Sequence, residues 1–126
     1  MKGMNSVILV GNLGGDPEMK VVGEGLKMTR VAVATTEVFR LKNGELCSQT
    51  EWHTVTFWRV LAELAVKYLR KGSLVYVEGR LRTRSYEDAG GLKRHVTEVV
   101  ANKLVMLDRR SGADPIDELF VDPAPF

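Results

Sequence analysis

Short segments in which apolar and polar residues alternate dominate the chain, and this period of two predicts a protein built mainly from β-strands. Residues 6–10 form a β-branched run that stops at a Gly-Asn pair, and residues 28–36 alternate with many Val, Thr and Ala residues. Residues 52–58 alternate strictly, with Trp and Thr on one face and His, Val and Phe on the other. The polar segment 37–49 is centred on Lys-Asn-Gly and is predicted to be a loop with a hairpin-type turn.

The period changes between residues 60 and 71, where apolar side chains recur at the spacing of one helix face. A glycine follows directly and is placed to end this helix. The strand pattern returns in residues 73–86, in which Gly79 indicates a bulge or a sharp bend, and again in residues 94–107. The predicted order is therefore three strands, one helix and two strands.

That order fits several small β-barrels, but a lone helix between the third and fourth of five strands is the arrangement of the OB-fold. We therefore predict an all-β fold, a five-stranded OB-fold barrel, over residues 1–107. Residues 108–126 form a short acidic C-terminal tail. From residue 111 onward the tail is rich in Asp and Pro, has no periodicity and is expected to be disordered.

Composition agrees with one soluble domain. A chain of 126 residues with 44% hydrophobic residues is close to the usual size of a single domain. No apolar run approaches the roughly 20 residues of a membrane helix, and the first residues lack the apolar stretch of a secretory signal. Together with a single cysteine, Cys47, these features predict a reducing, cytoplasmic location.

Charge is distributed unevenly along the chain. All 18 basic residues and 12 of the 16 acids lie within residues 1–110, which carry a net charge of +6, while the remaining residues carry −4. A basic folded surface attracts polyanions, whereas a short acidic end is typical of an interaction tail. We therefore expect an anionic partner for the body of the protein.

No motif for catalysis or for a metal site stands out. His53 and His95 lie on separate predicted strands without metal-ligand spacing, and Cys47 has no base beside it. The glycine-rich segment 11–15 matches neither nucleotide-binding glycine pattern and is predicted to be a turn. His53 shares its strand face with apolar residues, which favours a buried or interface histidine. We expect a protein that is not an enzyme and needs no metal or cofactor.

Aromatic and basic residues form the informative pattern. Trp52 and Trp58 share a strand face with only threonines between them, so this face is expected to be wet. One face of the fourth predicted strand carries Arg80, Arg82, Arg84 and Tyr86 by period-two counting. Phe39 lies among charged residues in the predicted loop. Single-stranded nucleic acids are bound by this combination, because aromatic rings stack on unpaired bases while Lys and Arg follow the phosphates.

Each of these features also has an ordinary structural explanation. Two tryptophans on a strand face more often anchor a core, and a row of arginines is usually a solvated surface. The combination of the tryptophan pair, the arginine row, the loop phenylalanine and the basic body favours binding of single-stranded nucleic acid over a surface without function.

Six motifs follow one another along the chain. They are Asn-Ser-Val-Ile-Leu-Val-Gly-Asn-Leu at 5–13, Asp-Pro-Glu at 16–18, Gln-Thr-Glu-Trp-His at 49–53, Tyr-Leu-Arg-Lys-Gly-Ser at 68–73, Val-Glu-Gly-Arg-Leu-Arg-Thr-Arg at 77–84 and Thr-Glu-Val-Val at 97–100. Over residues 2–107 the chain therefore resembles the bacterial single-stranded DNA-binding proteins. Members of that family bind single strands by base stacking combined with phosphate contacts, the same chemistry that the aromatic and basic pattern indicates.

The resemblance implies an OB-fold homotetramer that binds and protects single-stranded DNA in replication, recombination and repair, in the cytoplasm and associated with the nucleoid. The family's base-stacking positions fall on Phe39, Trp52, Trp58 and Tyr86. Its phosphate-contacting positions fall on Lys2, Arg40, Lys42, Arg70, Lys71, Arg82 and Arg84. His53 matches a position that the family uses near its subunit contacts.

The end of the chain resembles the family's acidic tip, through which partner enzymes dock. The residues implied in docking are Asp117, Glu118, Asp122, Pro125 and Phe126. The long Gly-, Pro- and Gln-rich linker that precedes the tip in the family is missing, and the acids are diluted. An OB-fold accessory protein of the primosomal kind, acting mainly through protein contacts, is the alternative; the final Pro-Phe pair and the full aromatic set argue against it.

Overall fold

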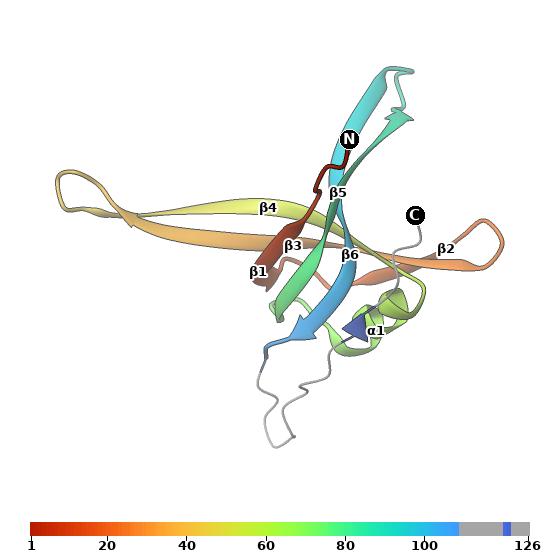
Figure 1. Ribbon diagram of the computed structural model, residues 1–126, viewed down its shortest axis with the longest axis horizontal. Coiled ribbons are helices and arrows are strands. Elements are labelled where there is room, and N and C mark those ends of the chain that lie inside the picture. Colours follow the sequence, from red (N-terminus) through yellow and green to blue (C-terminus); the bar gives the residue numbers. More distant parts are fainter. Residues whose placement is uncertain (109–119, 122–126) are drawn as a thin grey trace.

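The computed structural model describes residues 1–108 and 120–121 of the chain. Its elements are β1 (Val7–Leu13), β2 (Glu18–Val22), β3 (Leu26–Arg40), β4 (Leu46–Trp58), α1 (Val60–Tyr68), β5 (Leu74–Glu87), β6 (Lys93–Met106) and β7 (Phe120–Val121). The strands pair in the order β1-β5-β6-β4-β3-β2, and a further pairing of β1 with β3 closes the barrel (Figure 1). The predicted five-stranded OB-fold barrel with one helix before its fourth strand is confirmed.

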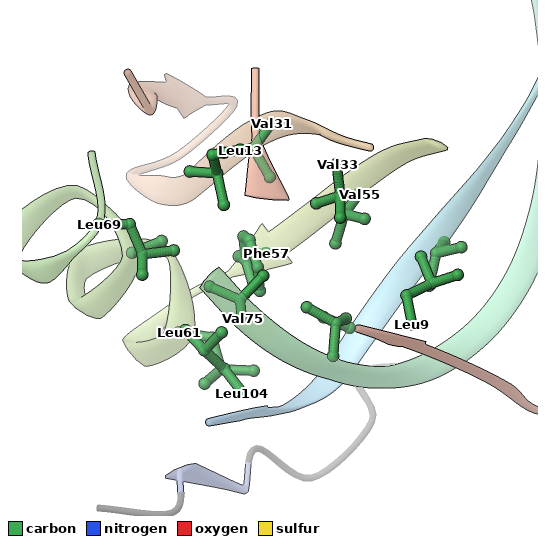
Figure 2. Packing of buried hydrophobic residues seen from close by; sticks show 14 of the residues in the cluster. Leu9, Leu13, Val31, Val33, Val55, Phe57, Leu61, Leu69, Val75 and Leu104 are labelled. Atoms are coloured by element: carbon green, nitrogen blue, oxygen red, sulfur yellow. The ribbon is translucent and has the colours of Figure 1, made fainter. Parts of the chain in front are cut away.

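The core fills the barrel because inward positions alternate along each strand. Val55 and Phe57 of β4 and Val75 of β5 are fully buried and meet inside the barrel (Figure 2). α1 adds Leu61 and Ala65 to the same cluster. Burying an aliphatic or aromatic side chain contributes roughly 1.5–3 kcal/mol, so this cluster holds the strands that carry the outer surface.

Two glycines allow backbones to approach closely in the barrel wall. A Cβ atom on Gly11 would lie 2.2 Å from the carbonyl oxygen of Ala34, and one on Gly79 would lie 2.2 Å from the carbonyl oxygen of Val100. The register of β5 and β6 shifts by one residue beside Gly79, and the extra residue is Asn102 of β6. The irregularity predicted at Gly79 therefore exists, but the alternation of β5 continues through it unchanged.

Two hairpins extend beyond the barrel, and the sequence analysis predicted the strands of only the second, between β5 and β6. β3 continues to Arg40 and β4 begins at Leu46, so most of the predicted loop 37–49 is a two-stranded antiparallel hairpin. We call residues 36–50 the β3–β4 arm and residues 82–97 the β5–β6 arm; the two project in different directions (Figure 1).

β2 is a strand that the sequence analysis did not predict. It pairs antiparallel with β3, and all five of its residues are exposed. Because neither face of β2 is buried, its sequence carries no alternation that could mark it as a strand.

The helix ends earlier than predicted, at Tyr68 rather than residue 71. The amide of Arg70 donates to the side-chain oxygen of Ser73 at 2.9 Å, and the amide of Lys71 donates to Oδ1 of Asp16 at 2.8 Å. These side-chain acceptors replace the carbonyls of a further helical turn and fix the two basic residues after α1.

Part of the C-terminal tail forms regular structure. β7 pairs antiparallel with β6, with Phe120 opposite Leu104 and Val121 opposite Lys103. The expectation of a tail without structure is therefore wrong for these two residues. The predicted docking residues Asp117, Glu118, Asp122, Pro125 and Phe126 lie outside the described residues.

Candidate nucleic-acid interface

The outer face of the barrel brings together strands that are far apart in the sequence. Thr56 of β4 lies opposite Arg30 of β3, and Arg82 of β5 lies opposite Glu98 of β6. The two strand pairs are joined where β4 and β6 run parallel, with Thr56 beside Val100. Side chains from four strands consequently share one surface.

This surface contains a groove of about 350 Å³, which we call the Trp58 groove. It is lined by Val22, Met28, Arg30, Trp58, Arg82, Arg84, Glu98 and Val100. One indole and three guanidinium groups thus meet over an apolar floor, with a single carboxylate among them. Three of the predicted DNA-contacting residues, Trp58, Arg82 and Arg84, are brought together here.

The strand face with the two tryptophans is only partly wet. Trp52 is 61% exposed and Trp58 is half-buried, but Thr56 between them is fully buried. Thr56 is covered because β3 and β6 flank it on both sides, through Arg30 and Val100. The expected wet face is therefore found at Trp52 and not at Thr56.

Trp52 is held beside two small residues and still remains exposed. It lies opposite Ala34, and a Cβ atom on Gly14 would come within 2.5 Å of its ring. The amide of Gly14 donates to the carbonyl of Ala32 at 2.9 Å, which fixes the backbone beneath the ring. The indole is thus supported on one side by backbone and accessible elsewhere, as a stacking platform requires.

The arginine row on β5 keeps the predicted alternation. The guanidinium carbon of Arg84 lies 5.8 Å from the ring centroid of Tyr86, on the same strand face. The opposite face of the arm carries Thr83, whose hydroxyl lies 2.8 Å from that of Thr97. Because the extra residue of the irregular pairing belongs to β6, Arg80 also stays on the arginine face.

Two charged residues of the groove were not predicted as site residues. Glu98 is 4% exposed, and its two carboxylate oxygens each lie 3.4 Å from an arginine Nε, that of Arg30 and that of Arg84. The signal for Glu98 is a lone acid in the otherwise apolar centre of the last predicted strand. For Arg30 there is only its place among the valines and threonines of β3.

The other predicted contact residues lie away from this groove. Phe39 is 43% exposed in the β3–β4 arm, opposite Cys47. The remaining basic positions are Lys2 before β1, Arg40 and Lys42 at the end of the β3–β4 arm, and Arg70 and Lys71 after α1. A ligand that touched all of them would have to follow the surface around the barrel.

The tip of the β5–β6 arm is held by Asp88. Its Oδ1 accepts hydrogen bonds from the amides of Gly90 and Leu92 at 2.9 and 3.0 Å, and its Oδ2 accepts one from Nε of Arg94 at 2.8 Å. The bond from Arg94, followed by that from the Leu92 amide, lowers the pKa of Asp88 below its ordinary value. These hydrogen bonds hold the turn at the end of the hairpin that carries Tyr86.

The histidine and the cysteine that the sequence analysis weighed as catalytic residues lie apart. Nε2 of His53 is 2.8 Å from the hydroxyl of Thr35, beside a pocket that Ile8 and Val10 help to line. Cys47 is half-buried in the β3–β4 arm. Within residues 1–108 and 120–121, no three His, Cys, Asp or Glu side chains are grouped to hold a metal ion, and no helix could cross a membrane.

The barrel topology, together with a groove that combines aromatic and cationic side chains, is that of an OB-fold nucleic-acid-binding domain. The chain belongs to the single-strand binding protein family, whose sequence pattern matches residues 4–107. The resemblance seen in the sequence motifs is therefore confirmed.

Relatives share most of the described sequence. The chain is 43% identical over 118 residues to a single-stranded DNA-binding protein of Neisseria meningitidis, covering 91% of this chain and 68% of the relative. It is 48% identical over 109 residues to one of Xanthomonas axonopodis pv. citri, covering 86% of this chain and 61% of the relative. The chain thus spans roughly two thirds of the length of these relatives.

A solved structure shares the fold. The single-strand binding protein of Plasmodium falciparum, determined in complex with single-stranded DNA, superimposes with a TM-score of 0.78 at 34% identity. The match covers 86% of this chain and 98% of the other.

Proposed function

We propose that this protein binds single-stranded DNA without strong sequence preference and protects it during replication, recombination and repair. The observation that carries the proposal is the Trp58 groove, in which an indole and three guanidinium groups share one surface. Aromatic rings stack on any base and cations follow the phosphates, so this chemistry tolerates every sequence. Membership of the single-strand binding protein family supports the same function.

In the proposed mode of binding, bases stack on Trp58 and on the exposed ring of Trp52. Phosphates contact Arg82 and Arg84 of β5, which line the same groove as Trp58. The DNA strand then continues to Tyr86 and Phe39, which are 47% and 43% exposed on the two arms. The basic residues Lys2, Arg40, Lys42, Arg70 and Lys71 contact phosphates along this path. Stacking and charge pairing need no bond-breaking chemistry, so the proposed activity is not enzymatic.

We infer that the protein assembles as a homotetramer. In the described part of the chain β1 pairs with β5 along its length but with β3 only at Asn12 and Leu13, which leaves one backbone edge open over its first residues. Ile8 and Val10 are 58% and 50% exposed beside the pocket that contains His53. An open strand edge beside exposed apolar side chains favours pairing with a second copy. Light scattering that gives a monomer mass at micromolar concentration would refute this.

The acidic tail is proposed to recruit enzymes of replication, recombination and repair in the cytoplasm, at the nucleoid. Asp117, Glu118 and Asp122 supply negative charge, and Pro125 and Phe126 supply an apolar contact. An acidic segment with an apolar anchor fits a basic pocket on a partner. Pull-down of partner enzymes should be lost in Phe126→Ala while DNA binding remains.

A titration with poly-dT tests the central proposal. Binding should quench tryptophan fluorescence and weaken steeply as salt is raised, because phosphate contacts release counterions. Poly-dC should bind comparably, whereas duplex DNA of the same length should bind far more weakly. Absence of binding to poly-dT at low salt would exclude the proposed function.

A further inference from the structure

A carboxylate in the floor of a DNA-binding groove opposes the charge that binds DNA. Glu98 occupies such a position in the Trp58 groove, directly opposite Arg82 in the β5–β6 register. Its side chain is 4% exposed, whereas those of Arg30 and Arg84 are 35% and 38% exposed. The acid therefore lies beneath the two arginines, between them and the barrel.

The contacts of Glu98 are electrostatic in character. Each carboxylate oxygen lies 3.4 Å from one Nε, and among the described residues Oε2 and both arginine Nε atoms have no hydrogen-bond partner although they are buried. One acid thus holds two cations that would otherwise repel each other. The guanidinium groups remain partly accessible from the groove.

We propose that Glu98 is a positioning residue of the DNA groove. It holds Arg30 and Arg84 as a unit of net charge +1 and thereby sets how many phosphate charges the groove neutralises. This inference rests on the proposed binding of single-stranded DNA. It adds Arg30, which lies on a different strand from the arginine row, to the cations that face the DNA, and it assigns the role of counter-charge to Glu98.

If Glu98 served only to stabilise the fold, its replacement would have a different effect. An acid that only stabilised the barrel would change the melting temperature when replaced, but it would leave the salt dependence of DNA binding unchanged. An acid that sets the charge of the groove changes the slope of log Kd against log salt, by about 0.7 for each phosphate neutralised on a single strand. The slope is therefore the readout that separates the two roles.

Four proteins test the proposal by salt titration with oligo-dT: the wild type, Glu98→Gln, Arg30→Gln and the double variant. The charge of the three-residue unit is +1 in the wild type, +2 in Glu98→Gln, 0 in Arg30→Gln and +1 in the double variant. The slope should be steeper by about 0.7 in Glu98→Gln, shallower by about 0.7 in Arg30→Gln, and restored in the double variant. Glu63→Gln is the matched control, because Glu63 pairs with Lys27 and does not line the groove.

A second readout needs no DNA. In the free protein, the nuclear magnetic resonance signals of the Nε–H groups of Arg30 and Arg84 should shift together in Glu98→Gln and stay in place in Glu63→Gln. Unmoved signals would show that Glu98 does not hold the arginines.

Equal slopes for the wild type and Glu98→Gln would overturn the proposal. If Glu98→Gln does not fold, the comparison of Arg30→Gln with the double variant decides, because the double variant must have the steeper slope. Failure of the wild type to bind oligo-dT would instead refute the proposed function itself. A wild type that binds while all variants share its slope would refute only the role of Glu98.

Discussion

The barrel and the β3–β4 arm are built from the same two strands, yet different forces hold their side chains. In the barrel, Val55 and Phe57 are fully buried, so the core fixes the end of β4 that carries Trp58. In the arm, Val38 and Leu46 are 68% and 65% exposed, and pairing between the two strands is what holds the residues. The core therefore places Trp58, whereas strand pairing alone places Phe39 in the β3–β4 arm.

The largest expected effect of a single substitution is on the barrel. Phe57→Ala removes a fully buried ring from the core cluster and should lower the free energy of unfolding by about 3–5 kcal/mol. Val38→Ala in the arm is the control and should change it by less than about 0.5 kcal/mol. Denaturant titration measures both. Equal losses in the two variants would contradict the difference between barrel and arm.

The next largest effect is a loss of DNA affinity at nearly unchanged protein stability. Trp52→Ala should weaken oligo-dT binding by about 1–3 kcal/mol, because a stacking ring is lost. Its side chain is 61% exposed, so the melting temperature should change little. Phe39→Ala in the arm should lose less affinity than Trp52→Ala. A large loss of stability in Trp52→Ala, with full affinity in the fraction that still folds, would show instead that the ring anchors the core.

A substitution beside Trp52, Gly14→Ala, tests whether the position of its ring matters for binding. In Gly14→Ala the new Cβ atom would lie 2.5 Å from the nearest carbon of the Trp52 ring, so the ring must move. Affinity for oligo-dT should fall, but by less than in Trp52→Ala, and the emission maximum of the free protein should shift. Gly15→Ala is the matched control, since a Cβ atom on Gly15 meets nothing within 4 Å. An unchanged affinity in Gly14→Ala would show that the ring position does not matter for binding.

The smallest expected effect is the acid sensitivity of the β5–β6 arm. The pKa of Asp88 is lowered in the folded protein, chiefly by its hydrogen bond from Arg94, so its contribution is present above the unfolded-state pKa of about 4. That contribution is lost as pH falls through the lower, folded-state pKa. The protection of the Gly90 and Leu92 amides against exchange should therefore fall in acid, relative to that of the core amides. Asp88→Asn should exchange faster at neutral pH and lose this dependence; the same acid response in Asp88→Asn would contradict the assignment.

The sequence predicted the barrel because each of its five strands buries at least one face. Residues 52–58 show this most clearly, with Val55 and Phe57 buried as the alternation required. β2 and the β3–β4 arm were missed for the opposite reason, since solvent covers both faces and no period distinguishes a paired strand from a polar loop. Pairing between strands in these segments, not burial, creates the structure.

The candidate site was predictable only in part. Trp58, Arg82 and Arg84 could be selected from local alternation, because each lies on a strand face that the sequence defines. The contacts of Glu98 with Arg30 depend on β4 bringing β3 and β6 together. No local pattern carries that information. The burial of Thr56 has the same cause, since its neighbours come from two strands that are distant in the sequence.

A titration of the variant Trp52→Phe with oligo-dT tests the central claim most directly, because Trp58 is then the sole tryptophan of the chain. If the Trp58 groove binds the strand, oligo-dT should quench this fluorescence to saturation, and raising the salt concentration should reverse the quenching. Binding that leaves the Trp58 emission unchanged would place the DNA elsewhere on the protein and contradict the account.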